Sequence, residues 1–242
     1  MPLTKVKDGS NMYQGGWVTH THSHLGGACY HGCTYCYVQA MAARFPSMKA
    51  RYSGPVRVIE NELRVNYGSG KTIFIEHMND FFASGVSGSD VGEIWDHLAR
   101  YPNNIYVFQS KDPIDPGLGE ANEIRDCDMI GTTIESNRGI DTVSAAPHPM
   151  DRAGAMADWK ALRPSVTRFL TIEPIMDFDL AEMVAIVDRV DPLFVNIGAD
   201  SKGSGLIEPS WDKIQNLIGV LKMHGYEIRR KSNLDRLAKG GR

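Results

Sequence analysis

The stretch Thr72-Ile-Phe-Ile-Glu-His-Met-Asn-Asp80 passes abruptly from a short apolar run to a cluster of polar side chains. The same pattern recurs four times further along the chain, at 105–113, 129–138, 166–174 and 193–202. Short continuous apolar runs of this kind are typical of strands buried on both faces of a parallel sheet. We therefore expect five such strands, with two weaker strands at 16–20 and 226–229.

Amphipathic segments lie between most of these runs, at 38–45, 90–100, 181–189 and in a segment that begins near a capping Ser210. Strands that alternate with helices predict an α/β protein with a parallel sheet. Six or seven strands favour a partial or complete TIM-like barrel over a small doubly wound sheet. In such barrels the chemistry lies at the C-terminal ends of the strands, which is where each polar cluster falls.

The composition is that of an ordinary globular protein. The 242 residues include 26 basic and 29 acidic residues, a formal net charge of −3, and 42% are hydrophobic. This excludes a disordered tail protein, a collagen-like repeat and a disulfide-dense secreted module. No apolar leader or membrane-spanning run occurs, so we expect a cytoplasmic protein without membrane contact. We expect one domain over residues 1–242, with its core at about 16–235 and a basic C-terminal tail.

Three of the four cysteines lie in the segment Cys29-Tyr-His-Gly-Cys-Thr-Tyr-Cys36. Thiolates are the usual ligands of iron–sulfur clusters, and three of them leave one iron of a 4Fe–4S cluster open to a small molecule. Zinc is the alternative, but structural zinc prefers four closed ligands, and His31 lies too close to Cys33 to complete the set without strain. Cys127 stands alone before a predicted strand, so we expect a buried structural thiol at the opposite end of the barrel.

The spacing Cys-x3-Cys-x-aromatic-Cys, with Tyr35 before Cys36, resembles the signature of the radical S-adenosylmethionine (SAM) enzymes. Segments 72–80, 131–137, 169–174 and 195–200 resemble a phage-associated branch of this superfamily, whose function is unknown. The resemblance covers residues 16 to 235 approximately. It implies a partial (β/α)6 barrel of the radical SAM type, with a 4Fe–4S cluster on Cys29, Cys33 and Cys36 and with SAM at the open iron.

The same resemblance implies a reaction and a partner, but it does not supply the substrate. One-electron reduction would cleave SAM into methionine and a 5′-deoxyadenosyl radical. The electron would come from a donor such as a flavodoxin or a ferredoxin. The alternative function is a non-catalytic iron–sulfur or nucleic-acid-binding barrel, in which the cysteine loop is a structural or sensing element.

One departure from the superfamily concerns the Gly-Gly-Glu motif that commonly binds the SAM amino group. Here that place reads Glu76-His-Met-Asn-Asp80, so the amine contact is open between Glu76, Asn79 and the backbone. SAM also needs donors for its carboxylate and polar partners for its ribose. We rank Glu135 and Asn137 first among the strand-end candidates, for each of which a solvated or capping role is the alternative. The predicted cofactor-binding residues are Tyr35, Glu76, Asn79, Gln109, Glu135, Asn137, Glu173 and Asp200.

Three histidines precede the cysteine loop. His20, His22 and His24 would share one face of an extended segment. We expect them to be hydrogen-bonding residues packed near the cluster, and a second metal site is the less favoured alternative.

The charge distribution is the basis of the substrate hypothesis. Seven basic and only two acidic residues lie between Lys222 and Arg242, in a chain that is otherwise acidic. Arg229, Arg230 and Lys231 follow the last predicted strand, so we expect some of them to face the open side of the barrel. They suggest a phosphate-bearing substrate such as a nucleotide or a short nucleic-acid segment. The alternative is a solvated helix with a basic tail, and the overall acidity argues against tight duplex binding.

Overall fold

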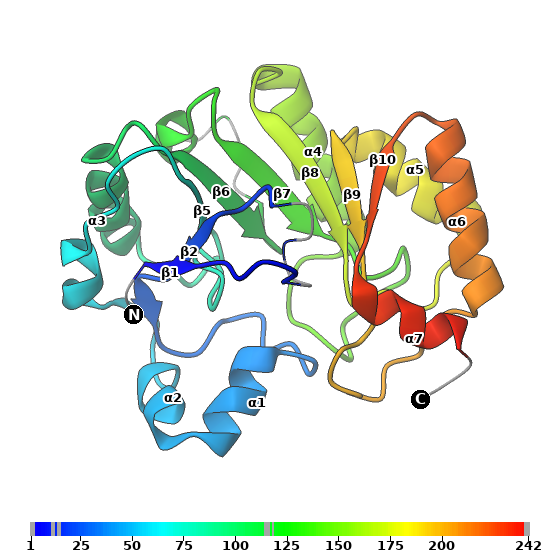
Figure 1. Cartoon of the computed structure of the whole chain (residues 1–242), viewed down its shortest axis with the longest axis horizontal. Coiled ribbons are helices and arrows are strands. Elements are labelled where there is room, and N and C mark those ends of the chain that lie inside the picture. Colours follow the sequence, from blue (N-terminus) through cyan, green and yellow to red (C-terminus); the bar gives the residue numbers. More distant parts are fainter. Residues whose placement is uncertain (1–2, 11–12, 14–15, 114–116, 118, 240–242) are drawn as a thin grey trace.

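Eight strands form one mostly parallel sheet, in the order β1-β2-β5-β6-β7-β8-β9-β10 (Figure 1). The computed structural model describes residues 3–10, 13, 16–113, 117 and 119–239. Its strands are β1 (Thr4–Lys5), β2 (His20–His22), β5 (Thr72–Ile75), β6 (Ile105–Ser110), β7 (Met129–Thr133), β8 (Thr167–Ile172), β9 (Phe194–Ile197) and β10 (Glu227–Arg230). In this sheet β2 and β5 to β10 run parallel, and β1 pairs antiparallel with β2. The predicted α/β fold with a partial TIM-like barrel is confirmed, and across the described residues the sheet stays open between β1 and β10.

The strand expected at 16–20 was misplaced. The chain becomes a regular strand only at His20, after Gly16 at a φ of 68° and after Trp17, whose ring packs on Phe169 and Phe194. A second, two-stranded sheet joins β3 (Leu25–Gly26) and β4 (Arg57–Val58) beside the cysteine loop.

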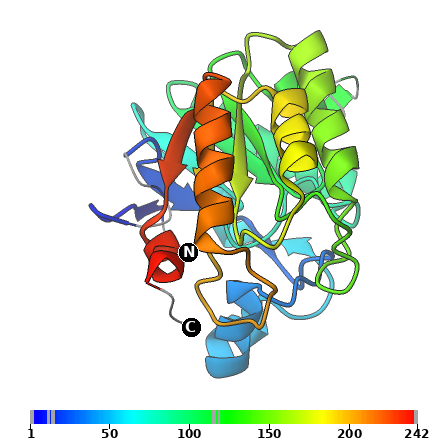
Figure 2. The ribbon, with the colours of Figure 1, turned by 90° about the vertical axis from the view of Figure 1, so that its right-hand side faces the viewer.

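Helices cover the outer face of the sheet, and α4, α5 and α6 stand side by side in Figure 2. The helices are α1 (Tyr37–Arg44), α2 (Pro46–Arg51), α3 (Gly88–Ala99), α4 (Pro149–Leu162), α5 (Leu180–Val190), α6 (Trp211–Met223) and α7 (Asp235–Ala238), with 3₁₀ turns η2 (Glu60–Arg64), η3 (Gly119–Glu123) and η4 (Ser232–Leu234). Ser210 caps α6 as expected, because its side chain accepts a hydrogen bond from the Lys213 N–H. No helix among the described residues is long and apolar enough to cross a bilayer.

The sequence gives no amphipathic signal for α4, although it is the longest of these helices. Its buried face consists of Ala153, Met156 and Trp159 together with the fully buried Arg152, so a charged residue interrupts the apolar periodicity. The start is nevertheless well specified. Pro149 occupies the first turn, where its missing N–H costs nothing, and the His148 ring accepts a hydrogen bond from the Met150 N–H.

Two apolar layers result from the alternation of side chains along the strands. The larger layer lies between the sheet and the helices, and it includes Ile73, Phe108 and Ile172. The smaller layer lies inside the barrel, where the apolar side chains are Val18, Phe74, Val107, Phe169 and Phe194. Two positions after Val107, Phe169 and Phe194, the same strands carry the polar residues Gln109, Thr171 and Asn196, so the inner face changes from apolar to polar towards the C-terminal ends of the strands.

The inner layer generates a prediction at Gly131 in β7. A Cβ atom at Gly131 would lie 2.5 Å from the Phe169 ring, so Gly131→Ala should lower the free energy of unfolding by about 1–3 kcal/mol. Gly219→Ala is the matched control, because a Cβ atom there meets nothing within 4 Å on exposed α6 and should stabilise the helix by about 0.5–1 kcal/mol. Urea denaturation measures both changes. Equal stability of the two variants would show that Phe169 is not packed on the Gly131 backbone.

Candidate functional site

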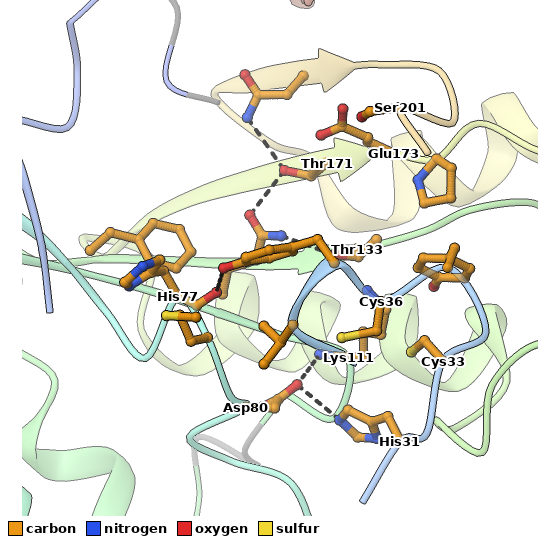
Figure 3. A pocket seen from close by; sticks show the side chains of 18 of the residues that line it. His31, Cys33, Cys36, His77, Asp80, Lys111, Thr133, Thr171, Glu173 and Ser201 are labelled. Carbon is orange, nitrogen blue, oxygen red and sulfur yellow. Dashed lines mark hydrogen bonds and ion pairs between the residues drawn. The ribbon is translucent and has the colours of Figure 1, made fainter. Parts of the chain in front are cut away.

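A cavity of about 540 Å³ opens at the C-terminal ends of the parallel strands (Figure 3). Cys29, Cys33 and Cys36 line one wall. The aromatic side chains of Tyr13, Trp17 and Phe74 line its inner end, which we call the aromatic floor. Between the cysteines and the floor lies a polar belt of strand residues. The cavity therefore brings three free thiols, hydrogen-bonding groups and stacking surfaces into one space.

The cysteine loop is held in place by the loop between β7 and α4. The Thr34 N–H donates to the Val143 carbonyl at 2.9 Å, and the Ala145 N–H donates to the His31 carbonyl at 2.8 Å. The Cys33 sulfur lies 3.1 Å from the Ser144 hydroxyl. Figure 3 shows Cys33 and Cys36 on this loop beside the cavity. Cys33 is buried, whereas Cys29 and Cys36 are half-buried.

The three thiols fit an iron–sulfur cluster better than a zinc ion. Within the described ranges, no three His, Cys, Asp or Glu side chains are grouped so that they would hold a metal ion. Structural zinc needs four ligands around one ion, whereas the cysteine ligands of a 4Fe–4S cluster are spread over its irons. Burial, with the nearby Asp80 carboxylate, raises the pKa of the Cys29 thiol to about 12, so a thiolate there needs a neighbouring cation. His31 is engaged elsewhere.

Asp80 ties the end of β5 to the cysteine loop. Its carboxylate accepts hydrogen bonds from His31 Nε2 at 2.9 Å, from the Ser110 hydroxyl at 2.6 Å and from the Lys111 N–H at 2.8 Å. Burial acts to raise the pKa of Asp80, but these bonds outweigh it and hold the pKa below its usual range. The hydrogen bond between Asp80 and His31 was not predicted from the sequence. The only available signal was the position of Asp80 in the polar run after a strand.

The Glu76 carboxylate already accepts hydrogen bonds from the protein, so it is not free to bind the SAM amine. The carboxylate accepts hydrogen bonds from the backbone N–H groups of His24 and Leu25 and from His24 Nδ1 at 2.8 Å. Its backbone adopts a φ of 56°, a left-handed conformation that is unusual for a glutamate. Glu76 still lines the cavity, and its contact with SAM stays a prediction.

Of the three histidines before the loop, His24 forms a buried hydrogen-bonded chain with Glu76 and with His97 of α3. His24 Nε2 lies 2.8 Å from His97 Nδ1, and His97 Nε2 donates to the Val65 carbonyl at 2.9 Å. Burial is the main reason that the pKa of His97 falls to about 4. His22 stacks on His24, and His20 lies nearer the surface, so His22 and His24 form part of a packed polar group.

Glu135 and Asn137 lie behind the cavity wall. Glu135 is fully buried and accepts hydrogen bonds from the Tyr35 hydroxyl and from Arg152 Nη1 at 2.9 Å, while Lys111 Nζ lies 3.5 Å away. Burial acts to raise the pKa of Glu135, but Lys111 and Arg152 outweigh it and lower the pKa below its usual range. Asn137 donates to Glu182 at 2.6 Å. Neither residue is among those that line the cavity, so their contact with SAM stays a prediction.

The polar belt joins neighbouring strands through side chains. Gln109 donates to the Thr133 hydroxyl at 2.9 Å and accepts from the Thr171 hydroxyl at 3.0 Å, and Asn196 donates to Thr171 at 3.3 Å. All four residues line the cavity. Because the amide nitrogen and the amide oxygen of Gln109 both have hydrogen-bond partners in the belt, the orientation of this side chain is fixed before a ligand binds.

The remaining predicted residues, Asn79, Glu173 and Asp200, also line the cavity. Asn79 donates to the Gly27 carbonyl at 3.2 Å, next to the cysteine loop. Glu173 accepts hydrogen bonds from Lys231 Nζ and from Asn233 Nδ2. Asp200 accepts from the Lys202 N–H at 2.9 Å and so shapes its own loop.

The predicted basic face is only partly present. Lys231 reaches the cavity, where Glu173 neutralises it. Arg229 instead stacks on the Phe194 ring, with its guanidinium carbon 3.5 Å from the ring centroid, and Arg230 pairs with Asp235 at 3.0 Å. Neither arginine lines the cavity, because Phe194 in β9 holds Arg229 and the Asp235 carboxylate holds Arg230.

Cys127 lies before β7, at the end of the sheet opposite the cavity, as predicted. The expectation that it is buried was wrong, because its side chain is exposed. The turn that carries it is fixed by Arg125, which contacts Asp128 at 2.6 Å, and this turn leaves the thiol at the surface.

Comparisons with known proteins identify the fold. No family model and no curated protein matches the sequence. Solved structures do match, among them three of spore photoproduct lyase variants. One, with bound AdoMet and dinucleoside spore photoproduct, matches 85% of this chain and 61% of its own, at 10% identity and a TM-score of 0.54. A second matches 82% of this chain and 58% of its own, at 12% identity and a TM-score of 0.55.

The third variant matches 90% of this chain and 77% of its own, at 9% identity and a TM-score of 0.60. The chain thus spans about three fifths of the length of the first two structures. At these identities the likeness concerns the fold, a mixed α/β architecture with a mostly parallel, open sheet.

The Glu135 contacts generate a prediction about stability. Arg152→Ala leaves a buried carboxylate without its main cationic partner, so it should lower the free energy of unfolding by about 3–5 kcal/mol. Lys160→Ala on the same helix is the control, because its pair with Asp191 is exposed and is worth less than about 1 kcal/mol. Urea denaturation compares the two. A loss for Arg152→Ala no larger than that for Lys160→Ala would contradict the buried ion pair.

Proposed function

We propose that this chain is a radical SAM enzyme of the phage-associated branch that its sequence resembles. Cys29, Cys33 and Cys36 would hold three irons of a 4Fe–4S cluster, and SAM would complete the fourth. The observation that carries the proposal is that the three cysteines share one wall of the main cavity. They do so in a fold shared with spore photoproduct lyase, which is a radical SAM enzyme.

When bound and reduced, the cluster supplies the electron that cleaves SAM into methionine and a 5′-deoxyadenosyl radical. The protein's own residues prepare the site for the thiolates. Lys111 and Arg152 place two cations around the buried Glu135 carboxylate, next to the cysteine loop. The Tyr35 hydroxyl, held by Glu135, fixes the loop between Cys33 and Cys36.

The SAM contacts that this geometry favours are the predicted residues that line the cavity: Tyr35, Glu76, Asn79, Gln109, Glu173 and Asp200. Asn79 is the residue that we favour in place of the missing Gly-Gly-Glu motif. It follows β5, and its side chain donates to the Gly27 carbonyl next to the cysteine loop. The Glu76 carboxylate is occupied by His24, which leaves the backbone of this turn as the second source of amine acceptors.

A nucleotide or a short nucleic-acid segment is the substrate class that we favour. The aromatic floor offers stacking faces, which are worth about 1–3 kcal/mol per base and tolerate any base. Gln109, Thr133, Thr171 and Asn196 offer hydrogen-bonding groups above it. A structure with a related fold was solved with a dinucleoside spore photoproduct bound, which is in keeping with this class.

We also propose a single catalytic unit that works in a reducing compartment. We take residues from about 16 to 235 as one catalytic unit, because β2 and β5 to β10 belong to one sheet whose C-terminal edge borders the main cavity. The four cysteines are free, which suits a reducing compartment such as the cytoplasm. A one-electron donor such as a flavodoxin or a ferredoxin would reduce the cluster there.

The first test is anaerobic reconstitution with iron and sulfide. The wild-type protein should bind about four irons per chain, and Cys33→Ala should lose the cluster. Cys127→Ala is the matched control, because this thiol lies at the opposite end of the sheet, and it should keep the cluster. Dithionite and SAM should then yield 5′-deoxyadenosine. Full iron in Cys33→Ala would refute the ligand assignment. A loaded wild-type protein that releases no 5′-deoxyadenosine would favour the non-catalytic barrel.

A second test separates the cavity-lining residues from those behind the wall. Asn79→Ala should weaken SAM binding about tenfold, the loss of roughly one hydrogen bond, while the iron content stays unchanged. Asn137→Ala should have a smaller effect, because Asn137 contacts Glu182 outside the cavity. Isothermal titration of SAM into the cluster-loaded proteins measures both. An equal or larger loss of SAM affinity in Asn137→Ala would instead support the sequence-based prediction that Asn137 is one of the first-ranked SAM contacts.

A further inference from the structure

A second cavity of about 270 Å³ lies against the cysteine loop. Cys29, Cys36, Val38 and Met78 line both this cavity and the main one, so they form a shared wall between them. Cys33 lines the main cavity alone. The second cavity is otherwise lined by residues of α1, α2 and the turn before Cys29. Two of the three proposed cluster ligands are therefore accessible from a side that does not contain the proposed SAM site.

The surface around the second cavity is positively charged. No aspartate or glutamate occurs between Asp8 and Glu60, although the chain as a whole has a net charge of −3. Arg44, Lys49 and Arg57 are exposed, and among the described residues no carboxylate lies within ion-pair distance of them. Lys49 itself lines the second cavity. Arg57 donates only to the carbonyls of Ser53 and Pro55, which leaves its charge unneutralised.

An exposed aromatic ring adds an apolar contact to this surface. Phe45, between α1 and α2, is 44% exposed and lies 5.2 Å from the Arg44 guanidinium carbon. Aromatic residues and arginine are the types enriched in protein interfaces. Both helices project from the sheet at the lower left of Figure 1, so a partner reaches them without meeting α3 to α6. We call Arg44, Phe45, Lys49 and Arg57 the α1–α2 surface.

We propose that the α1–α2 surface docks a small acidic one-electron donor protein of the flavodoxin type, which delivers its electron through the shared wall at Cys29 and Cys36. This inference rests on the proposed function. The donor loses one electron and the oxidised cluster gains it, and no atom is transferred. Electron transfer slows steeply with distance, so a donor must approach where ligand thiols are nearest to the surface. Complementary charge raises the rate of encounter and orients the donor.

A nucleic acid would also be attracted by positive charge, but the location favours a protein donor. A substrate must reach the main cavity, to which α1 contributes only Tyr37 and Val38. None of the three exposed cations lines that cavity. The positive charge of the α1–α2 surface therefore lies on the side of the second cavity, across the shared wall from the main cavity.

The test compares the reduction of the cluster by reduced flavodoxin with its reduction by dithionite. At low ionic strength, Arg44→Glu with Lys49→Glu should slow flavodoxin-dependent reduction, followed by the visible absorbance of the cluster, about tenfold. Ala43→Trp should also slow it, because this exposed residue lines the second cavity and the bulky ring would cover the shared wall. Lys222→Glu, an exposed cation on α6, is the matched control and should leave the rate unchanged.

Titration calorimetry adds a readout that does not need the cluster. Flavodoxin should bind the wild-type chain more tightly than the charge-reversed variant, whether or not iron is present. Dithionite-driven SAM cleavage should be the same in all variants. Equal flavodoxin rates and affinities in all variants would overturn the docking surface, as would a loss of oligonucleotide affinity alone. A wild-type protein that binds flavodoxin at this surface but does not cleave SAM would instead refute the proposed function.

Discussion

The buried carboxylate of Glu135 is the interaction on which the site depends. It joins the hydroxyl of Tyr35 on the cysteine loop, the ammonium of Lys111 after β6 and the guanidinium of Arg152 on α4. Since Glu135 itself follows β7, four separate segments converge on one group that has no access to water. Removing a partner from a buried charge is costly, so these segments hold one another in position. The rigidity of the cysteine loop is therefore a property of the sheet and of α4 rather than of the loop alone.

A second constraint is the change of character along the inner face of the strands. Phe169 and Thr171 are neighbours on one face of β8, and Phe194 and Asn196 are neighbours on one face of β9. The apolar members pack together, and the polar members form the belt above them. Because side chains alternate between the faces, the same strands supply both members of each pair. The cavity is thus lined with groups whose positions are set by the sheet register.

Features that consecutive residues specify were predictable from the sequence, and features that depend on distant residues were not. The strand at 72–75 and the polar residues after it were predictable, because both the apolar run and its end are written in consecutive residues. α4 was missed because Arg152, buried by its bond to Glu135, occupies a face that an apolar residue usually takes. Glu135 was identified as a strand-end carboxylate, but its partner Tyr35 lies 100 residues away in the chain. Distant partners decide whether such a carboxylate faces a ligand or a salt bridge, and a single sequence does not record them.

The open side of the barrel gives Trp17 a particular importance. Its ring packs at 5.1 Å from Phe169 and at 5.0 Å from Phe194, and the Arg229 guanidinium carbon lies 3.5 Å from the Phe194 centroid and 5.8 Å from the Trp17 centroid. The gap between the outermost strands is thus filled by side chains and not by a backbone ladder. Widening the barrel at this seam costs ring contacts but breaks no interstrand hydrogen bond. A bulky ligand is therefore accommodated at the lowest cost by rotation of the Trp17 indole, which makes this side chain an adjustable part of the cavity wall.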